Sequence, residues 1–371
     1  MSLPKYCTKC WVPETRPRIT FNEEGVCNAC SWAEEKKTIN WQDRGEYLAR
    51  LCDRFRTANN NPDIVVPFSG GKDSIYVAHK MKELGMTPLL MTVLPHLETE
   101  IGAWNRKNMC PGMERYEINL AEEKYRGLAR KYFTEQGRPK HPWECAISAV
   151  VISQAAKLGI PFIMYGEEGE AEYGGTTREI ERWKQPVDLE YLTKYYWQEG
   201  QCDWKVPEDL SNVYFTQYSR YENWSPSKHA NYAISKGMRT VPVRSVGTYT
   251  SHSQLSDDLQ DLHAYLMFVK FGFGRATSDA CIALREGWTN REETLSWIEN
   301  YDGEFPTKHL QKYLDYFDMT EDEFSAVIAS HANREMVNHT YKYLWGVDPA
   351  VAKWRRKDTR IGMLNPGKYD F

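Results

Sequence analysis

The chain has 371 residues, a length that leaves room for two or three domains with a sizeable buried core. Hydrophobic residues make up 41% of it and charged residues 26%, a balance that excludes a disordered or fibrous protein. The 47 Lys and Arg and the 51 Asp and Glu residues give a formal net charge of −4, which argues against a general nucleic-acid binder.

Neither a membrane span nor a secretion signal is evident. The most apolar stretch, residues 146–165, is interrupted by Gln154, Lys157, Gly159 and Pro161. The first ten residues contain no apolar run of the kind that a signal peptide needs. We therefore expect a cytoplasmic protein that does not insert into a membrane.

Two Cys-x-x-Cys pairs lie near the start of the chain, Cys7 with Cys10 and Cys27 with Cys30. Their separation is typical of two turns that present four thiolates to one tetrahedral zinc ion. A redox Cys-x-x-Cys is the alternative, but prolines follow the first pair where such a motif needs a helix. We predict a zinc ribbon over residues 1–35, with these four cysteines as the metal ligands.

The next segments predict an alternation of strands and helices. A helix at 41–56 and a polar loop form a linker over residues 36–62, and a buried strand at 63–68 opens the main domain. Further strands are expected at 88–94, 114–120 and 161–165, with helices at 75–84, 121–133 and 146–158. This order predicts an α/β fold with a doubly wound parallel sheet over residues 63–250.

The remainder of the chain reads as aromatic-rich and mostly helical. A strand is expected at 241–249, and a C-terminal helical region is expected over residues 251–371. Its predicted helices lie at 255–271, 290–300, 307–317 and 320–331.

A glycine-rich turn, Ser-Gly-Gly-Lys-Asp-Ser at residues 69–74, follows the first strand of the main domain. Gly70 and Gly71 allow the backbone N–H groups to approach an anion, and the following helix adds its positive N-terminal end. The spacing matches neither the P-loop of NTPases nor the dinucleotide-binding fingerprint. We expect phosphate to bind at this turn.

The turn resembles the PP-loop of the ATP pyrophosphatase superfamily. Members of this superfamily split ATP between its α and β phosphates, adenylylate an oxygen atom, and let a nitrogen or sulfur nucleophile displace AMP. The resemblance implies that Lys72 offsets the charge of the leaving pyrophosphate and that Asp73 orients the loop or a Mg²⁺ ion. The residues that it implies for ATP binding are Ser69, Gly70, Gly71, Lys72, Asp73 and Ser74.

Beyond the loop, the chain is similar to the N-acetyl sugar amidotransferase family, which makes acetamidino sugars for bacterial surface polysaccharides. The similarity extends over residues 1–335 and includes two segments that are not general PP-loop features. It rests on the ribbon at 7–30, the loop at 69–74, the acidic segment at 165–175 and the Gly/Phe segment at 270–277. The resemblance implies a glutaminase subunit and a cyclase-like subunit as partners that supply ammonia.

Two further residues are predicted to be catalytic, Glu167 and Arg275. Glu167 lies in the acidic segment, which follows a predicted strand and would lie where open α/β sheets bind ligands, so its carboxylates suit Mg²⁺ or sugar hydroxyls. A solvated acidic loop is the alternative. Arg275 ends the Gly/Phe segment as a cation for phosphate, and the alternative is a tight turn with Arg275 in a structural ion pair.

Together these features predict an ATP-dependent amidotransferase. It would convert the acetamido group of a nucleotide-linked N-acetyl sugar to an acetamidino group, in the biosynthesis of lipopolysaccharide O-antigen or nonulosonic acid. A glutaminase domain would need roughly 200 residues of its own, so ammonia would come from a separate protein. The alternatives are a tRNA-modifying PP-loop enzyme of the thiolation type, disfavoured by the sequence pI of about 6.2, and a non-catalytic ATP-binding scaffold.

Overall fold

The computed structural model describes residues 4–58, 61–188, 212–333, 337–339 and 354–356. These residues form two compact units, each discontinuous in sequence. The ribbon unit combines residues 1–33, 126–140 and 241–371, and the sheet unit combines residues 34–125 and 141–240. The domain boundaries predicted at residues 35, 62 and 250 stay predictions.

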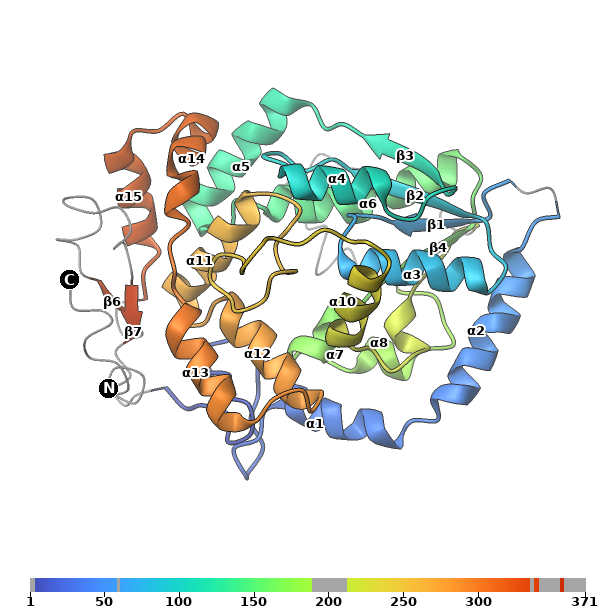
Figure 1. Ribbon diagram of the computed structural model, residues 1–371, viewed down its shortest axis with the longest axis horizontal. Coiled ribbons are helices and arrows are strands. Elements are labelled where there is room, and N and C mark those ends of the chain that lie inside the picture. The colour runs from blue at the N-terminus through green and yellow to red at the C-terminus, as the bar shows by residue number, and fades with distance from the viewer. Residues whose placement is uncertain (1–3, 59–60, 189–211, 334–336, 340–353, 357–371) are drawn as a thin grey trace. The chain divides into compact units, whose positions relative to one another are not determined.

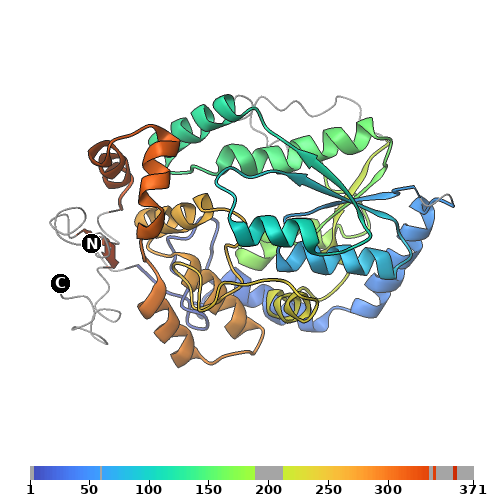
Figure 2. The same ribbon diagram turned by 45° about the horizontal axis from the view of Figure 1, so that its top comes forward.

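The sheet unit is built on five parallel strands in the order β3-β2-β1-β4-β5 (Figures 1 and 2). In register, Val65 of β1 lies opposite Leu89 of β2 and Ile163 of β4. The order reverses between β1 and β4, because the chain adds β2 and β3 on one side of β1 and β4 and β5 on the other. The strands are β1 (Ile64–Pro67), β2 (Pro88–Val93), β3 (Glu114–Ile118), β4 (Phe162–Tyr165) and β5 (Tyr214–Gln217).

Helices cover both faces of this sheet, because the central strands bury side chains on both sides. Ile64 and Val66 of β1 face a core shared with helices α2, α3 and α10. Val65 faces the opposite core, which contains the apolar side of α6. This arrangement confirms the predicted doubly wound parallel α/β fold. The helices of this unit are α2 (Trp41–Phe55), α3 (Lys72–Glu83), α4 (Glu100–Asn108), α6 (His141–Lys157), α7 (Gly169–Tyr173), α8 (Arg178–Glu181) and α10 (Pro226–Ser235).

The ribbon unit contains the four predicted zinc ligands and most of the C-terminal helices. Its ribbon has two isolated antiparallel bridges, Tyr6 with Pro13 and Phe21 with Cys27. The cysteines share a buried cluster with Cys281 and Ile298 of the helical part. The helices here are α11 (Leu259–Phe271), α12 (Arg275–Arg285), α13 (Arg291–Tyr301), α14 (Leu310–Phe317) and α15 (Glu321–Ser330).

Two further helices and a short strand pair lie outside these two lists. Helices α1 (Asn28–Glu35) and α5 (Glu122–Gln136) each have residues in both units. A short antiparallel pair joins β6 (Val337–His339) to β7 (Trp354–Arg356). Among the described residues, no helix has the length and apolar character needed to cross a membrane.

The prediction of a strand at residues 241–249 is wrong. This segment consists of turns and bends, although Val241, Val243 and Val246 supply the β-branched pattern. Pro242 has no N–H to donate to a ladder, and Gly247 has a φ of +70°, which is incompatible with a regular strand.

Candidate active site

The predicted phosphate loop connects the end of β1 to the start of α3. Gly71 is the N-cap of α3, so the helix begins at Lys72. Gly70 has a φ of +75°, and a Cβ there would lie 2.5 Å from the backbone nitrogen of Arg106 in α4. Glycine is therefore required at position 70 both by the left-handed backbone and by the close approach of α4.

Hydroxyl groups and free backbone donors surround this turn. Ser69 Oγ accepts a hydrogen bond from the backbone N–H of Gly71 at 3.2 Å, and Ser74 Oγ donates to the carbonyl of Gly71 at 3.0 Å. The backbone N–H groups of Lys72, Asp73 and Ser74 make no hydrogen bond to any other described residue. Three orphan donors at the positive end of a twelve-residue helix form a site suited to an anion.

Charged side chains stand next to these donors. Lys72 Nζ contacts Asp73 Oδ2, and Asp73 Oδ1 lies 2.9 Å from Nδ1 of His229, a residue of α10. Burial alone would raise the pKa of Asp73, but the Lys72 ammonium and the hydrogen bond from His229 outweigh it and hold this pKa well below its usual value. Asp73 is therefore a carboxylate at neutral pH.

The end of β4 lies beside the loop. A Cβ on Gly166, the residue after β4, would lie 3.1 Å from the Trp224 ring and 3.9 Å from Cβ of Asp73. The segments that follow β1 and β4 thus meet at the point where the strand order reverses. In open α/β sheets this crevice at the carboxyl ends of the strands is where ligands bind.

The acidic segment after β4 is folded rather than solvated. Glu168, Glu170 and Glu172 are buried, and Glu172 pairs with Lys36 at 2.8 Å. Glu167, the predicted catalytic residue, is half-buried, and its catalytic role stays a prediction.

Glu168 belongs to the acidic segment predicted to suit Mg²⁺ or sugar hydroxyls, but it was not among the residues predicted to be catalytic. Its carboxylate caps α7 by accepting from the backbone N–H groups of Glu170 at 3.4 Å and Ala171 at 2.9 Å. Burial raises the pKa of Glu168 to about 7, although the Ala171 hydrogen bond and the charge of Arg220 oppose the shift. A glutamate is not a preferred N-cap residue, so no local sequence signal distinguished Glu168 from Glu167.

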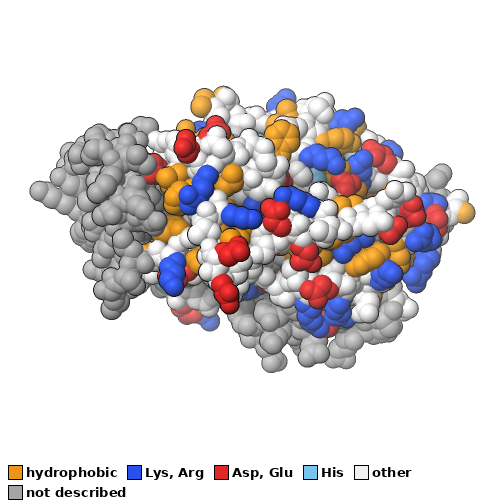
Figure 3. Space-filling view, turned by 90° about the horizontal axis from the view of Figure 1, so that it is seen from below, with side chains coloured by type: hydrophobic (Ala, Val, Ile, Leu, Met, Phe, Trp, Pro, Cys, Tyr) orange, Lys and Arg blue, Asp and Glu red, His pale blue; other side chains and the backbone are white. Residues whose placement is uncertain are grey.

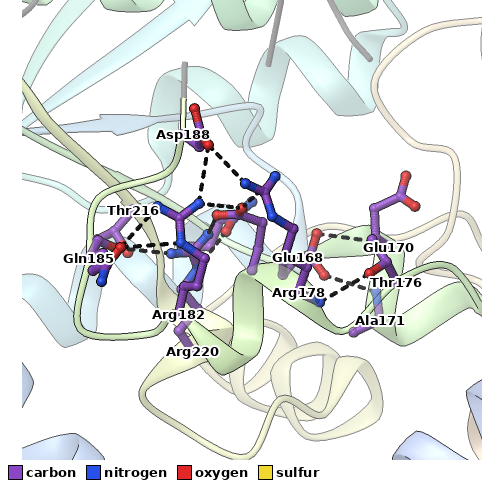
Figure 4. A network of polar contacts seen from close by, with 12 residues as sticks. Glu168, Glu170, Ala171, Thr176, Arg178, Arg182, Gln185, Asp188, Thr216 and Arg220 are labelled. Carbon is purple, nitrogen blue, oxygen red and sulfur yellow. Dashed lines mark hydrogen bonds and ion pairs between the residues drawn. The ribbon is translucent and has the colours of Figure 1, made fainter. Parts of the chain in front are cut away.

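An ion-pair network supports this segment from the side of α8. Arg220 and Glu179 are both buried and form a salt bridge of 2.7 Å. Figure 4 shows Arg178 and Arg182 pointing toward Asp188, at 3.0 Å and 3.2 Å. The network ties the residues after β4 to those after β5, so it stabilises the loops on that side of the site.

The four cysteines of the ribbon fit a zinc ion. All four are buried, and their sulfur atoms lie within 4.8 Å of one another. Cys7 Sγ is 3.9 Å from Cys30 Sγ, and Cys10 Sγ is 3.6 Å from Cys27 Sγ. Sulfurs placed at about 2.3 Å from a tetrahedral zinc would be roughly 3.8 Å apart, so the cluster could bind zinc without rearrangement.

The groups around Cys10 favour its thiolate form. The thiols of Cys27 and Cys281 lie next to Cys10 Sγ and lower the pKa of Cys10. Arg285 Nη1 is 3.7 Å from the same sulfur. Neighbouring positive charge and hydrogen bonds to sulfur are the usual surroundings of metal-binding thiolates.

Arg275 lies in the ribbon unit, at the first position of α12. It forms a salt bridge with Asp279 at 2.8 Å. The N-terminal donors of α12 are taken by Asp302, which accepts from the backbone N–H of Gly274 at 2.9 Å and of Thr277 at 3.1 Å. A carboxylate of this chain thus occupies the helix end at which a phosphate was expected, and the catalytic role of Arg275 stays a prediction.

The surface in Figure 3 carries both signs of charge. Among the described residues on that face, basic and acidic side chains are interspersed. This mixture agrees with a net charge of only −4.

Residues 214–348 match the family model described as LPS biosynthesis protein WbpG-like, C-terminal domain. This match confirms the predicted resemblance to proteins of surface-polysaccharide biosynthesis over that range. No match was found among curated proteins. Among solved structures, the chain is similar to a predicted subunit of tRNA methyltransferase from Methanocaldococcus jannaschii, with 16% identity, a TM-score of 0.32, and coverage of 58% of this chain and 91% of that one.

Proposed function

We propose that this protein is an ATP-dependent amidotransferase that converts an acetamido group of a nucleotide-linked N-acetyl sugar to an acetamidino group. The observation that carries the proposal is the loop at 69–74, with three orphan N–H donors and Lys72 beside the point where the strand order reverses. The family match to lipopolysaccharide biosynthesis over residues 214–348 supports a sugar as the second substrate.

The proposed reaction has two steps. First, the acetamido oxygen of the sugar attacks the α-phosphate of ATP, the bond between the α and β phosphates breaks, and pyrophosphate leaves. Ammonia then adds to the carbon of the adenylylated amide, the C–O bond breaks, and AMP leaves with the acetamido oxygen. Adenylylation makes this oxygen a good leaving group, so one difficult substitution becomes two easier steps.

Residues of the loop would act on the leaving pyrophosphate. The N–H groups of Lys72, Asp73 and Ser74 and the hydroxyls of Ser69 and Ser74 would hold its oxygens, and the Lys72 ammonium would stabilise the charge that develops on them. Asp73, ionised at neutral pH, would orient Lys72 or a Mg²⁺ ion. Glu167, on the β4 side of the crevice, would contact the ion or the sugar hydroxyls.

Zinc would have a structural role in this protein. A site with four cysteine ligands is closed and keeps no position open for substrate, so Cys7, Cys10, Cys27 and Cys30 would hold the ribbon together. Ammonia would come from a separate glutaminase subunit with a cyclase-like subunit, and ammonium salts would replace both in the test tube.

The test is AMP release from Mg-ATP in the presence of ammonium chloride and a panel of UDP- and CMP-linked N-acetyl sugars. The proposal predicts AMP that depends on one sugar, together with a product mass lower by the difference between oxygen and NH. AMP that depends on bulk tRNA instead would identify a tRNA-modifying enzyme. Tight ATP binding with no AMP under any condition would identify a non-catalytic scaffold.

Two lysines of α3 provide a matched pair of variants. Lys72→Ala should lower the rate of AMP release by about a hundredfold or more, because it removes charge stabilisation of the leaving group. Lys82→Ala, at an exposed position of the last turn of the same helix, should leave the rate unchanged. Equal activity of the two variants would remove the loop from the mechanism.

A further inference from the structure

A buried histidine contacts the phosphate loop from outside the sequence motif. His229 lies 156 residues beyond Asp73, on α10, and its side chain is completely buried. Its Nδ1 lies 2.9 Å from Asp73 Oδ1, while its Nε2 is buried without a hydrogen-bond partner among the described residues. His229 belongs to the region that matches the family model, so this region contributes directly to the loop.

Aromatic side chains fix the orientation of the His229 ring. The Tyr76 ring stacks on it with a centroid distance of 4.2 Å, and the Trp224 ring meets it edge-on at 4.2 Å. Tyr76 is itself held by a hydrogen bond from its hydroxyl to Glu222 at 2.5 Å. The imidazole therefore cannot turn away from Asp73 without displacing one of these packed rings.

The hydrogen bonds assign the protons in this group. An ionised carboxylate only accepts, so the Nδ1 of His229 carries the proton of this hydrogen bond. Asp73 uses Oδ1 for His229 and Oδ2 for Lys72. An ammonium has three N–H donors, and Asp73 takes one, so Lys72 keeps two donors for an anion at the loop.

We propose that His229 is a positioning residue, which holds the Asp73 carboxylate and, through it, the Lys72 ammonium in place to stabilise a leaving pyrophosphate. This inference rests on the proposed function of the loop. It gives residues 214–348, the region that matches the family model, a role in ATP cleavage in addition to any contact with the sugar. His229 itself need not touch either substrate, since its Nδ1 is already bonded to Asp73.

Two substitutions at position 229 separate positioning from packing. His229→Asn places an amide N–H where Nδ1 lies and keeps a donor for Asp73, although it leaves the aromatic pocket partly empty. His229→Gln fills the pocket better but carries its amide nearer to the position of Nε2. A positioning role favours the Asn variant, and a packing role favours the Gln variant.

The first readout is the binding of Mg-pyrophosphate to the full chain by titration calorimetry. We expect the Asn variant to bind within about threefold of the wild type and the Gln variant to bind at least tenfold more weakly. In AMP release, the Gln variant should lose about a hundredfold in kcat with little change in KM for the sugar. The opposite order of the variants, or equal behaviour, would overturn the inference.

Failure of the proposed function has a different signature. If the wild type binds Mg-pyrophosphate but releases no AMP with any sugar, the proposed function fails, while the order of the two variants still tests His229. If the wild type does not bind pyrophosphate, both are overturned. Should the Gln variant fail to fold, nitrogen-15 NMR of the wild type decides: a proton on Nδ1 of His229 supports the inference, and a proton on Nε2 alone overturns it.

Discussion

At the scale of single residues, Gly70 shows why the loop needs glycine at one position more than at the next. Gly71 has an ordinary φ of −84°, and a Cβ there would meet only the Ser69 hydroxyl, at 3.2 Å. Gly70 combines a φ of +75° with backbone atoms of Arg106 inside the space that a Cβ would fill. The sequence motif contains both glycines, but only the folded backbone and the approach of α4 distinguish them.

We predict that Gly70→Ala lowers the free energy of unfolding by about 2–4 kcal/mol, from backbone strain and the overlap with α4. The matched control is Gly159→Ala, because Gly159 has a φ of +70° but nothing within 4 Å of its Cβ position. The control substitution should lower the free energy of unfolding by about 1 kcal/mol, because only the left-handed backbone disfavours alanine there. Urea unfolding measures both values, and equal losses would show that α4 does not constrain the loop.

Glu168 provides a prediction on pH. The pKa of Glu168 is raised from 4.5 in the unfolded chain to about 7 in the folded protein. The folded state thus binds more protons between these values, and Glu168 reduces stability progressively as the pH rises from 4.5 to about 7. Relative to Glu168→Gln, the wild type should lose about 2.5 kcal/mol of unfolding free energy between pH 5 and pH 8. Parallel pH profiles of the two proteins in chemical unfolding would contradict the raised pKa.

Some residues of the candidate site can be identified from a local sequence motif, and others can be identified only from the folded structure. The loop at 69–74 lies where its motif places it, between β1 and α3. His229 is far from this motif in sequence and reaches it because α10 packs on α3, and Trp224, which precedes α10, packs against His229. A lone histidine between a lysine and an alanine carries no local signal of such a contact.

At the scale of elements, sequence patterns predicted strands β1 to β4 of the sheet and missed β5. β1, β2 and β4 are apolar runs buried on both faces, so they stand out from their surroundings. β5 is not an apolar run, because it ends in Thr216 and Gln217, and it lies in a segment whose composition predicts aromatic-rich helices. The false strand at 241–249 shows the opposite error, since β-branched residues there are separated by proline and glycine.

The ribbon gives a prediction for metal content. We expect the purified protein to contain about one zinc ion per chain, and Cys27→Ser to lose it, because each thiolate supplies one of four bonds. Cys52→Ser is the control, since Cys52 is also buried but lies on α2, in the sheet unit. Metal analysis by mass spectrometry gives the answer. Zinc retained in the Cys27 variant, or lost equally in both, would contradict the assigned ligands.

At the scale of the whole molecule, the chain passes between its two units several times, and local patterns do not show this. Residues 126–140, within the run predicted to form one domain, join the C-terminal helices. This segment joins the C-terminal helices because Phe133 of α5 contacts residues far away in the sequence. Its ring stacks on the Phe317 ring with a centroid distance of 4.7 Å and packs against the Phe324 ring at 5.0 Å. Helical periodicity predicts that α5 has an apolar side, but not which core it joins.

The proposed amidotransferase reaction is tested most directly by measuring whether the acetamido oxygen of the sugar is transferred to AMP. The wild-type protein would be given Mg-ATP, ammonium chloride and a nucleotide-linked N-acetyl sugar labelled with oxygen-18 in its acetamido group. If this oxygen attacks the α-phosphate, mass spectrometry will find the label in AMP and none in the sugar product. AMP without the label would mean that water or another group attacks ATP, and the amidotransferase account would be wrong.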